Sequence, residues 1–115
     1  MNVSFFFWII LSYSTNILAN QDSLWAIWHN EEIVPIERLA VLQALNIKYL
    51  YEAPDSCWEV IELQNQYATA QRNDFWIAKS LDNKAEWYSL ADQIDSAILY
   101  SHRAITLFEQ IWKQE

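Results

Sequence analysis

The sequence contains no glycine, two prolines and a single cysteine among its 115 residues. Glycine supplies the positive backbone angle of tight hairpin turns and the close backbone approach of phosphate-binding loops, so its absence argues against a β-hairpin protein and a glycine-rich nucleotide site. A lone cysteine, Cys57, excludes an internal disulfide. Basic residues are also scarce: seven stand against fifteen acidic ones, and the net charge of −8 disfavours nucleic-acid or anionic-membrane binding.

The residues that are abundant are typical of a helical protein. Trp, Leu, Ile and Ala dominate, and a hydrophobic content of 53% excludes a wholly disordered chain. The length is enough for one small domain with its own core. The composition therefore predicts an all-α fold.

Residues 1–20 differ from the rest because they carry no charged side chain and contain the apolar run 5–11. That run is shorter than the roughly 20 residues needed to span a bilayer, which favours a secretory signal cleaved after Ala19. The Lys or Arg that usually precedes such a run is missing, so an uncleaved anchor or a buried helix stays open as an alternative. We expect an exported protein, periplasmic or secreted, with or without a membrane tether.

Residues 21–115 predict one short helix and four longer ones. The short helix would end at Trp28 and be capped by Asp22 or Ser23. Pro35 and Pro54 suit helix starts, and dense apolar residues in the helix beginning at Pro35 predict that it is covered on more than one side. The next helix should run from about 55 to 72. Two further helices would run from 75 to 90 and from about 93 onward, capped by Asp74 and Asp92.

The last two of these helices carry matching stripes that advance by three or four residues, each one face of a helix. A polar connection at 91–93 leaves room only for a tight antiparallel turn. Hairpins at about 35–72 and 75–114 are therefore expected in tandem. The stripes are Ala78, Leu81, Ala85 and Tyr88 on the first helix, and Ala97, Ser101, Ala104, Phe108 and Ile111 on the second.

The spacing of Ala85, Tyr88, Ala97 and Ala104 resembles the tetratricopeptide repeat, a roughly 34-residue helix-turn-helix unit. The chain departs from the repeat at Ser101, where an aromatic residue is usual, and in lacking the turn glycine. The earlier hairpin is a looser match, with Cys57 standing 40 positions before Ala97. The resemblance implies antiparallel hairpins stacked as a short α-solenoid.

Four short segments also resemble the region that precedes such repeats in bacterial signalling proteins. Those proteins carry a signal peptide, an exported repeat array, a transmembrane helix and a cyclase, histidine-kinase or DNA-binding output domain, and no residue of such an output domain occurs here. The resemblance implies a non-catalytic protein-interaction or sensory scaffold, the start of a longer array, whose membrane link would be the leader or a downstream segment. The segments are 24–28, 38–39, 49–51 and 53–56.

The last helix carries more apolar surface than one neighbouring helix is expected to cover, because a terminal repeat normally has a polar outer side. This predicts a stacking interface for a further repeat of the same chain or for a partner protein. A self-contained secreted protein that homodimerises through this helix is the alternative, and a fold-back onto Trp76 and Trp87 is a third possibility. The predicted stacking residues are Ile105, Phe108, Ile111 and Trp112, with Leu107 beside them.

In the repeat family the concave groove is lined by the first helix of each hairpin. Acidic residues here replace the basic and amide groups that bind a peptide's terminal carboxylate, so the resemblance implies a cationic or neutral peptide, against the alternative of a merely solvated helix face. The matching positions are Lys79, Asp82, Glu86 and Ser89, with Asn46 and Tyr49 upstream.

No residue pattern indicates catalysis, a metal or a cofactor. His29 and His102 have no companion ligands at metal-binding spacing, and Cys57 suits a buried small position. An acidic stripe at 55, 59 and 62 is best explained as a solvated helix face. Six tryptophans are expected to pack between helices, with an aromatic platform for a sugar, peptide or cation as the alternative: Trp25, Trp28, Trp58, Trp76, Trp87 and Trp112.

Overall fold

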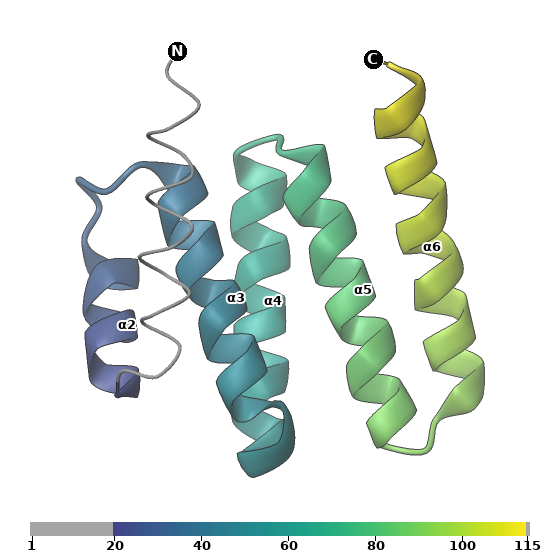
Figure 1. The fold of residues 1–115 in the computed structure, drawn as a ribbon, viewed down its shortest axis with the longest axis horizontal. Helices are drawn as coiled ribbons and strands as arrows, with labels where there is room; N and C mark the ends of the chain where they lie inside the picture. The colour runs from purple at the N-terminus through teal and green to yellow at the C-terminus, as the bar shows by residue number, and fades with distance from the viewer. Residues whose placement is uncertain (1–19, 115) are drawn as a thin grey trace.

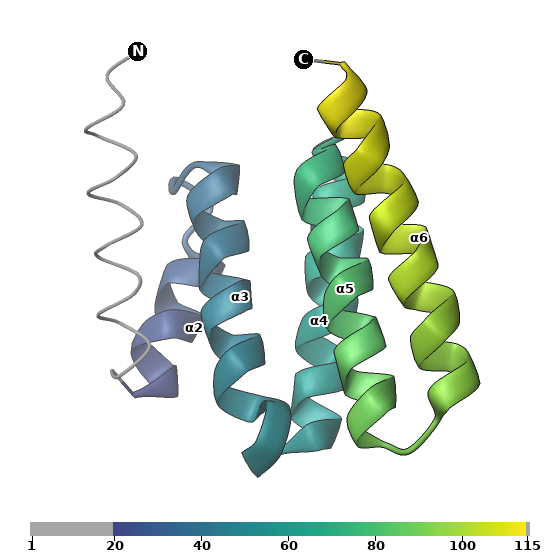
Figure 2. The ribbon, with the colours of Figure 1, turned by 45° about the vertical axis from the view of Figure 1, so that its right-hand side comes forward.

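The protein is an all-α stack of antiparallel helices, seen in a computed structural model that describes residues 20–114. Figures 1 and 2 show the helices following one another in chain order, with α5 and α6 side by side in both views. The predicted fold class is confirmed. The predicted leader lies outside the described residues apart from Asn20. The helices are α2 (Gln21–His29), α3 (Pro35–Glu52), α4 (Pro54–Ala70), α5 (Asp74–Leu90) and α6 (Ile94–Lys113).

Helix starts follow the prediction where proline stands and differ where a polar cap was expected. Pro35 and Pro54 occupy first helical positions, where the missing N–H costs nothing. The cap of α5 is Asn73, whose Oδ1 accepts from the backbone N–H of Trp76 at 3.1 Å, so the assignment to Asp74 was wrong. Asn20 likewise caps α2 through the N–H of Ser23, at 3.0 Å.

The assignment of Asp92 as a helix cap was also wrong, because Asp92 lies in the turn that closes the C-terminal end of α5. Its φ of 62° is left-handed, as is the φ of 54° at Arg72 after α4. The N–H groups of Asn73 and Gln93 then bond back to the last turns of α4 and α5, a closure that glycine usually permits. With no glycine in the chain, an Asp and an Arg adopt this conformation. Helix α6 starts at Ile94, and Gln93 stands at its N-cap position without a side-chain hydrogen bond.

The core changes character along the stack. In the first hairpin most of its side chains are large and aliphatic, and α3 contributes eight buried residues, as expected for a helix covered on more than one side. Between α5 and α6 the buried positions are small: Ala85 is 5% exposed and Ala104 2%. These alanines let the two helix backbones approach closely, which confirms the predicted small-residue contact.

Three amides meet where α5 lies against both helices of the first hairpin. Asn83 Nδ2 donates to Gln43 Oε1 at 2.6 Å and to Gln64 Oε1 at 2.8 Å. Gln64 Nε2 in turn donates to Gln43 Oε1 at 3.0 Å, and Gln64 is fully buried. Because buried amides must be hydrogen-bonded, this network favours one position of α5 on the first hairpin. A purely apolar contact would allow α5 to shift along the hairpin.

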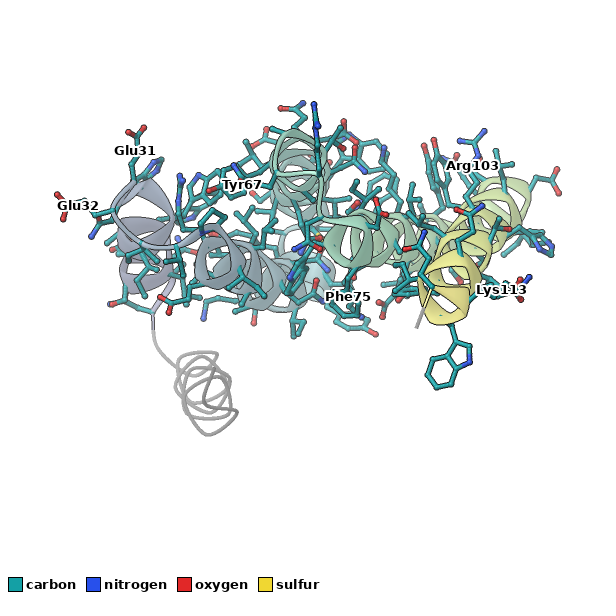
Figure 3. The ribbon with its side chains drawn as sticks, turned by 90° about the horizontal axis from the view of Figure 1, so that it is seen from above. Glu31, Glu32, Tyr67, Phe75, Arg103 and Lys113 are labelled. Atoms are coloured by element: carbon teal, nitrogen blue, oxygen red, sulfur yellow. The ribbon has the colours of Figure 1, made fainter. Side chains whose placement is uncertain are left out.

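Helix α2 is held to the first hairpin by Arg38. Its Nε donates to the Trp28 carbonyl at 2.8 Å, and one terminal nitrogen donates to the Tyr67 hydroxyl at 2.9 Å. The guanidinium also lies 4.5 Å from the centre of the Trp28 ring and 4.7 Å from that of Tyr67. One cation thus joins α2, α3 and α4. In the view from above, Glu31 and Glu32 lie at the α2 end of the row of helices and Lys113 lies at the α6 end (Figure 3).

Candidate functional site

An open groove runs between α5 and α6, with a volume of about 560 Å³. One wall comes from the second half of α5, and the other comes from the apolar side of α6. Its lining includes two carboxylates and one imidazole, and the other lining side chains are small or apolar. The lining residues are Asp82, Ala85, Glu86, Ser89, Ile94, Ala97, Ile98, Ser101, His102 and Ile105.

Three of the predicted groove residues meet here: Asp82, Glu86 and Ser89 lie on successive turns of α5 and line the groove. Lys79, one turn earlier, stands outside the lining and forms an ion pair with Asp82 at 3.6 Å. Since both partners of this pair are partly exposed, it contributes little stability and leaves the groove acidic.

The upstream pair Asn46 and Tyr49 does not form a groove, which corrects the prediction for these two residues. They are only 2% and 8% exposed. Asn46 Oδ1 accepts from the Cys57 thiol of α4 at 2.9 Å, and the Tyr49 hydroxyl accepts from Trp25 Nε1 of α2 at 3.0 Å. Both side chains are therefore buried and hydrogen-bonded by the helices that pack on α3, α4 for Asn46 and α2 for Tyr49.

The predicted stacking residues of α6 divide into two groups. Ile105 and Trp112 are 52% and 78% exposed, whereas Phe108 and Ile111 are half-buried. The ring of Phe108 packs edge-on against Phe75, with centroids 5.8 Å apart. The fold-back alternative thus holds for Phe108, through Phe75 rather than through Trp76 or Trp87 themselves.

Sequence reasoning missed the first half of the exposed stripe, Ile94 and Ile98, which are 52% and 51% exposed. The helical spacing from Ile94 through Ile98 to Ile105 was the signal that could have found them. The apolar surface therefore extends along α6 from its first turn rather than gathering in its last turns.

Helices α4 and α6 occupy equivalent places in the two hairpins, 40 positions apart. For each buried residue of α4, the residue 40 positions later in the sequence lies on α6 and is buried or half-buried. Two of these later positions, Ala97 and Ala104, are the buried residues of α6. The equivalent pairs are Cys57 and Ala97, Val60 and Tyr100, Ile61 and Ser101, Gln64 and Ala104, and Ala68 and Phe108.

The same 40-residue offset relates the exposed stripe of α6 to a stripe of α4. On α4, the equivalent stripe is the surface that receives α5: the Pro54 carbonyl accepts from Trp87 Nε1 at 2.9 Å, and the Trp58 ring contacts the Trp87 ring at 4.8 Å. Farther along, Glu62 pairs with Lys84 at 2.7 Å and Asn65 donates to Ser80 at 2.8 Å. The counterparts on α6 are Ile94, Ile98, His102 and Ile105, and all four line the groove.

Cys57 is fully buried, as predicted, and its thiol is held as a hydrogen-bond donor. Burial raises the pKa of the Cys57 thiol from 9.0 to about 11, and the Glu86 carboxylate adds to the rise. Both effects disfavour the thiolate, which is the form that attacks electrophiles and binds metals.

The raised pKa of the Cys57 thiol predicts that the protein becomes less stable at alkaline pH. Below pH 9 both the folded and the unfolded chain keep the proton; between pH 9 and 11 only the unfolded thiol loses it, so the free energy of unfolding falls as pH rises. We expect a loss of about 2 kcal/mol by pH 11 relative to Cys57→Ala. Urea unfolding of both proteins from pH 8 to 11 measures it, and parallel pH profiles would contradict the assignment.

The three carboxylates predicted to form an acidic stripe on α4 differ in burial. Glu62 Oε1 is buried and is compensated by the Lys84 ammonium, whereas Asp55 and Glu59 are exposed near the start of α4. Within residues 20–114, no group of three His, Cys, Asp or Glu residues is placed to hold a metal ion. In the same part of the chain, no helix combines the length and apolarity that crossing a membrane requires.

Comparisons with protein-family models, with curated proteins and with solved structures found no match. The likeness to tetratricopeptide repeats therefore rests on the sequence spacing alone.

Proposed function

We propose that the protein is a non-catalytic interaction scaffold that binds an amphipathic helix in the groove between α5 and α6. The observation that carries the proposal is the register between α4 and α6. The stripe that α4 uses to hold α5 recurs on α6 as Ile94, Ile98, His102 and Ile105, and there it is exposed. Covering two of these isoleucines would contribute about 3 kcal/mol to binding.

The charge of the groove favours a basic helix. Asp82 and Glu86 line it on the α5 side, within a chain of net charge −8. A helix with an apolar stripe and flanking Lys or Arg residues would satisfy both walls, because opposite charges steer association and like charges oppose it. Such a helix would come from another protein or from a further repeat of the same chain. In keeping with the sequence resemblance, we place this scaffold in the exported N-terminal part of a signalling protein.

The test uses two neighbouring residues on different faces of α6, since successive positions of a helix are rotated by about 100°. Ile98 lines the groove and is 51% exposed, while Leu99 is 46% exposed and lies outside it. A synthetic amphipathic helix as long as α5, 17 residues, is prepared with flanking lysines and again with flanking glutamates. Fluorescence anisotropy should show binding of the lysine peptide and at least tenfold weaker binding by Ile98→Asp, because a charge replaces apolar surface that the bound helix would cover.

Leu99→Asp is the matched control. Its affinity for the lysine peptide should lie within twofold of that of the unchanged protein, a difference in binding free energy of about 0.4 kcal/mol or less. Equal loss in both variants, or equal binding of the two peptides, would overturn the proposal. The alternative of a homodimer through α6 is tested by sedimentation equilibrium. A dimer that dissociates with Ile98→Asp and does not bind the lysine peptide would favour it.

A further inference from the structure

A second depression, of about 590 Å³, lies at the end of the molecule where α4 begins and α5 ends. It is separate from the groove between α5 and α6, with which it shares no lining residue. Three aromatic rings and two carboxylates dominate its lining, and none of the described residues that line it is basic. The lining residues are Asp55, Trp58, Glu59, Trp87, Tyr88 and Gln93.

The three rings form one continuous aromatic wall. The centroids of Trp58 and Trp87 are 4.8 Å apart, and Tyr88 lies 5.4 Å from each. Their planes are inclined to one another by 54°, 72° and 86°. A flat sugar ring stacks best on a flat aromatic surface, whereas mutually inclined rings suit a rounded group.

Contacts outside the depression hold these rings in place before any ligand arrives. Trp87 Nε1 donates to the Pro54 carbonyl at 2.9 Å, which joins the end of α5 to the start of α4. Tyr88 stacks on Tyr100 of α6, with an interplanar angle of 11° and centroids 5.5 Å apart. Rings fixed in this way lose little conformational freedom on binding, so less of the binding free energy is lost.

The same aromatic cluster already attracts cations from the protein itself. Lys84 Nζ lies 5.2 Å from the centre of the Trp58 ring and 5.3 Å from that of Tyr100. Arg103 lies 5.2 Å from the Tyr100 ring centre. These cations stand beside the depression rather than in its lining, which within residues 20–114 combines aromatic rings and the Asp55 and Glu59 carboxylates with no basic side chain.

We infer that this depression binds an alkylammonium group, either on a small quaternary amine or on a lysine side chain. The aromatic wall supplies cation–π attraction and apolar contact for the methyl or methylene groups. Asp55 and Glu59 supply the opposite charge, and both are exposed enough to approach a ligand without first losing a buried partner. This inference does not depend on the proposed helix-binding groove.

The test compares choline with its neutral carbon isostere, 3,3-dimethylbutan-1-ol, and with N-acetyl-lysine amide, each titrated into the full chain. The indole N–H signals of Trp58 and Trp87 are followed by nuclear magnetic resonance. Choline or the lysine derivative should shift both signals and bind at least tenfold more tightly than the neutral isostere. The stronger of the two cations identifies whether the source is a quaternary amine or a lysine side chain.

The matched variants change charge without touching the rings. Asp55→Asn with Glu59→Gln should weaken choline binding about tenfold. Asp22→Asn with Glu109→Gln removes the same charge from exposed positions elsewhere and should leave binding within twofold. Equal affinity for choline and the isostere, equal weakening in both double variants, or shifts that spare Trp58 and Trp87 would each overturn the inference.

Discussion

Replacing Asn83 with alanine is expected to lower the free energy of unfolding by about 2 to 4 kcal/mol. Asn83 is 2% exposed and donates to both Gln43 and Gln64, so its removal takes a donor from the buried Gln64 Oε1 and one of two donors from the partly buried Gln43 Oε1. The loss exceeds that of an ordinary hydrogen bond because Gln64 Oε1 stays buried without this donor. Urea unfolding followed by circular dichroism measures the change.

Two further variants decide whether the network itself is responsible. Gln66→Ala removes an exposed amide of α4 and should change the free energy of unfolding by less than about 0.5 kcal/mol. The double variant Asn83→Ala with Gln64→Ala should cost less than the sum of the single changes, because the two side chains share hydrogen bonds. Additive losses would contradict the network.

Replacing Arg38 with methionine is expected to cost about 2 to 3 kcal/mol. Methionine retains much of the apolar stem but loses the hydrogen bonds to the Trp28 carbonyl and the Tyr67 hydroxyl, together with both ring contacts. Since these contacts join α2 to the first hairpin, Trp28 should become more accessible. Tryptophan fluorescence quenching by acrylamide and thermal unfolding together measure the effect.

Arg103→Met is the matched control, because Arg103 also lies over an aromatic ring but is exposed on α6. It should cost less than about 1 kcal/mol, as expected for an exposed cation–π contact. Equal destabilisation by the two substitutions would show that Arg38 has no special role in holding α2. A rise in quenching with Arg103→Met would point to the same conclusion.

The regular elements were predictable from local pattern. Pro35 and Pro54 marked helix starts because proline needs no N–H there, and the alternation of small and large residues around Ala85 and Ala104 identified the contact face of the last hairpin. Such signals depend on residues three or four positions apart, which a single helix brings together whatever surrounds it.

The errors arose where neighbouring polar residues competed for one role. Asn73 and Asp74 can both cap a helix, whereas before α6 the capping residue Asp92 is followed by Gln93, which takes the cap position without a side-chain hydrogen bond. The outcome follows from the preceding helix: bonds from the N–H groups of Asn73 and Gln93 to the last turns of α4 and α5 place Asp92 at a left-handed position. The capping propensity of a residue does not include these hydrogen bonds to the preceding helix.

The candidate sites were predictable only in part. Asp82, Glu86 and Ser89 follow helical spacing and do line one groove, whereas Asn46 and Tyr49 have the matching sequence position but are covered by α4 and α2. The aromatic wall joins Trp58 to residues about 30 positions later in the chain. Neither outcome is visible until separate helices are placed against one another.

By itself, the sequence determined that this chain forms helices, where most of them begin, and which faces are apolar, since these properties depend on spacing within one helix. Only the tertiary structure decided which polar side chains are buried in a three-helix amide network, which apolar stripe stays exposed, and which rings share a depression with carboxylates. Those choices depend on contacts between residues far apart in sequence, whose burial and desolvation are set by packing rather than by local pattern.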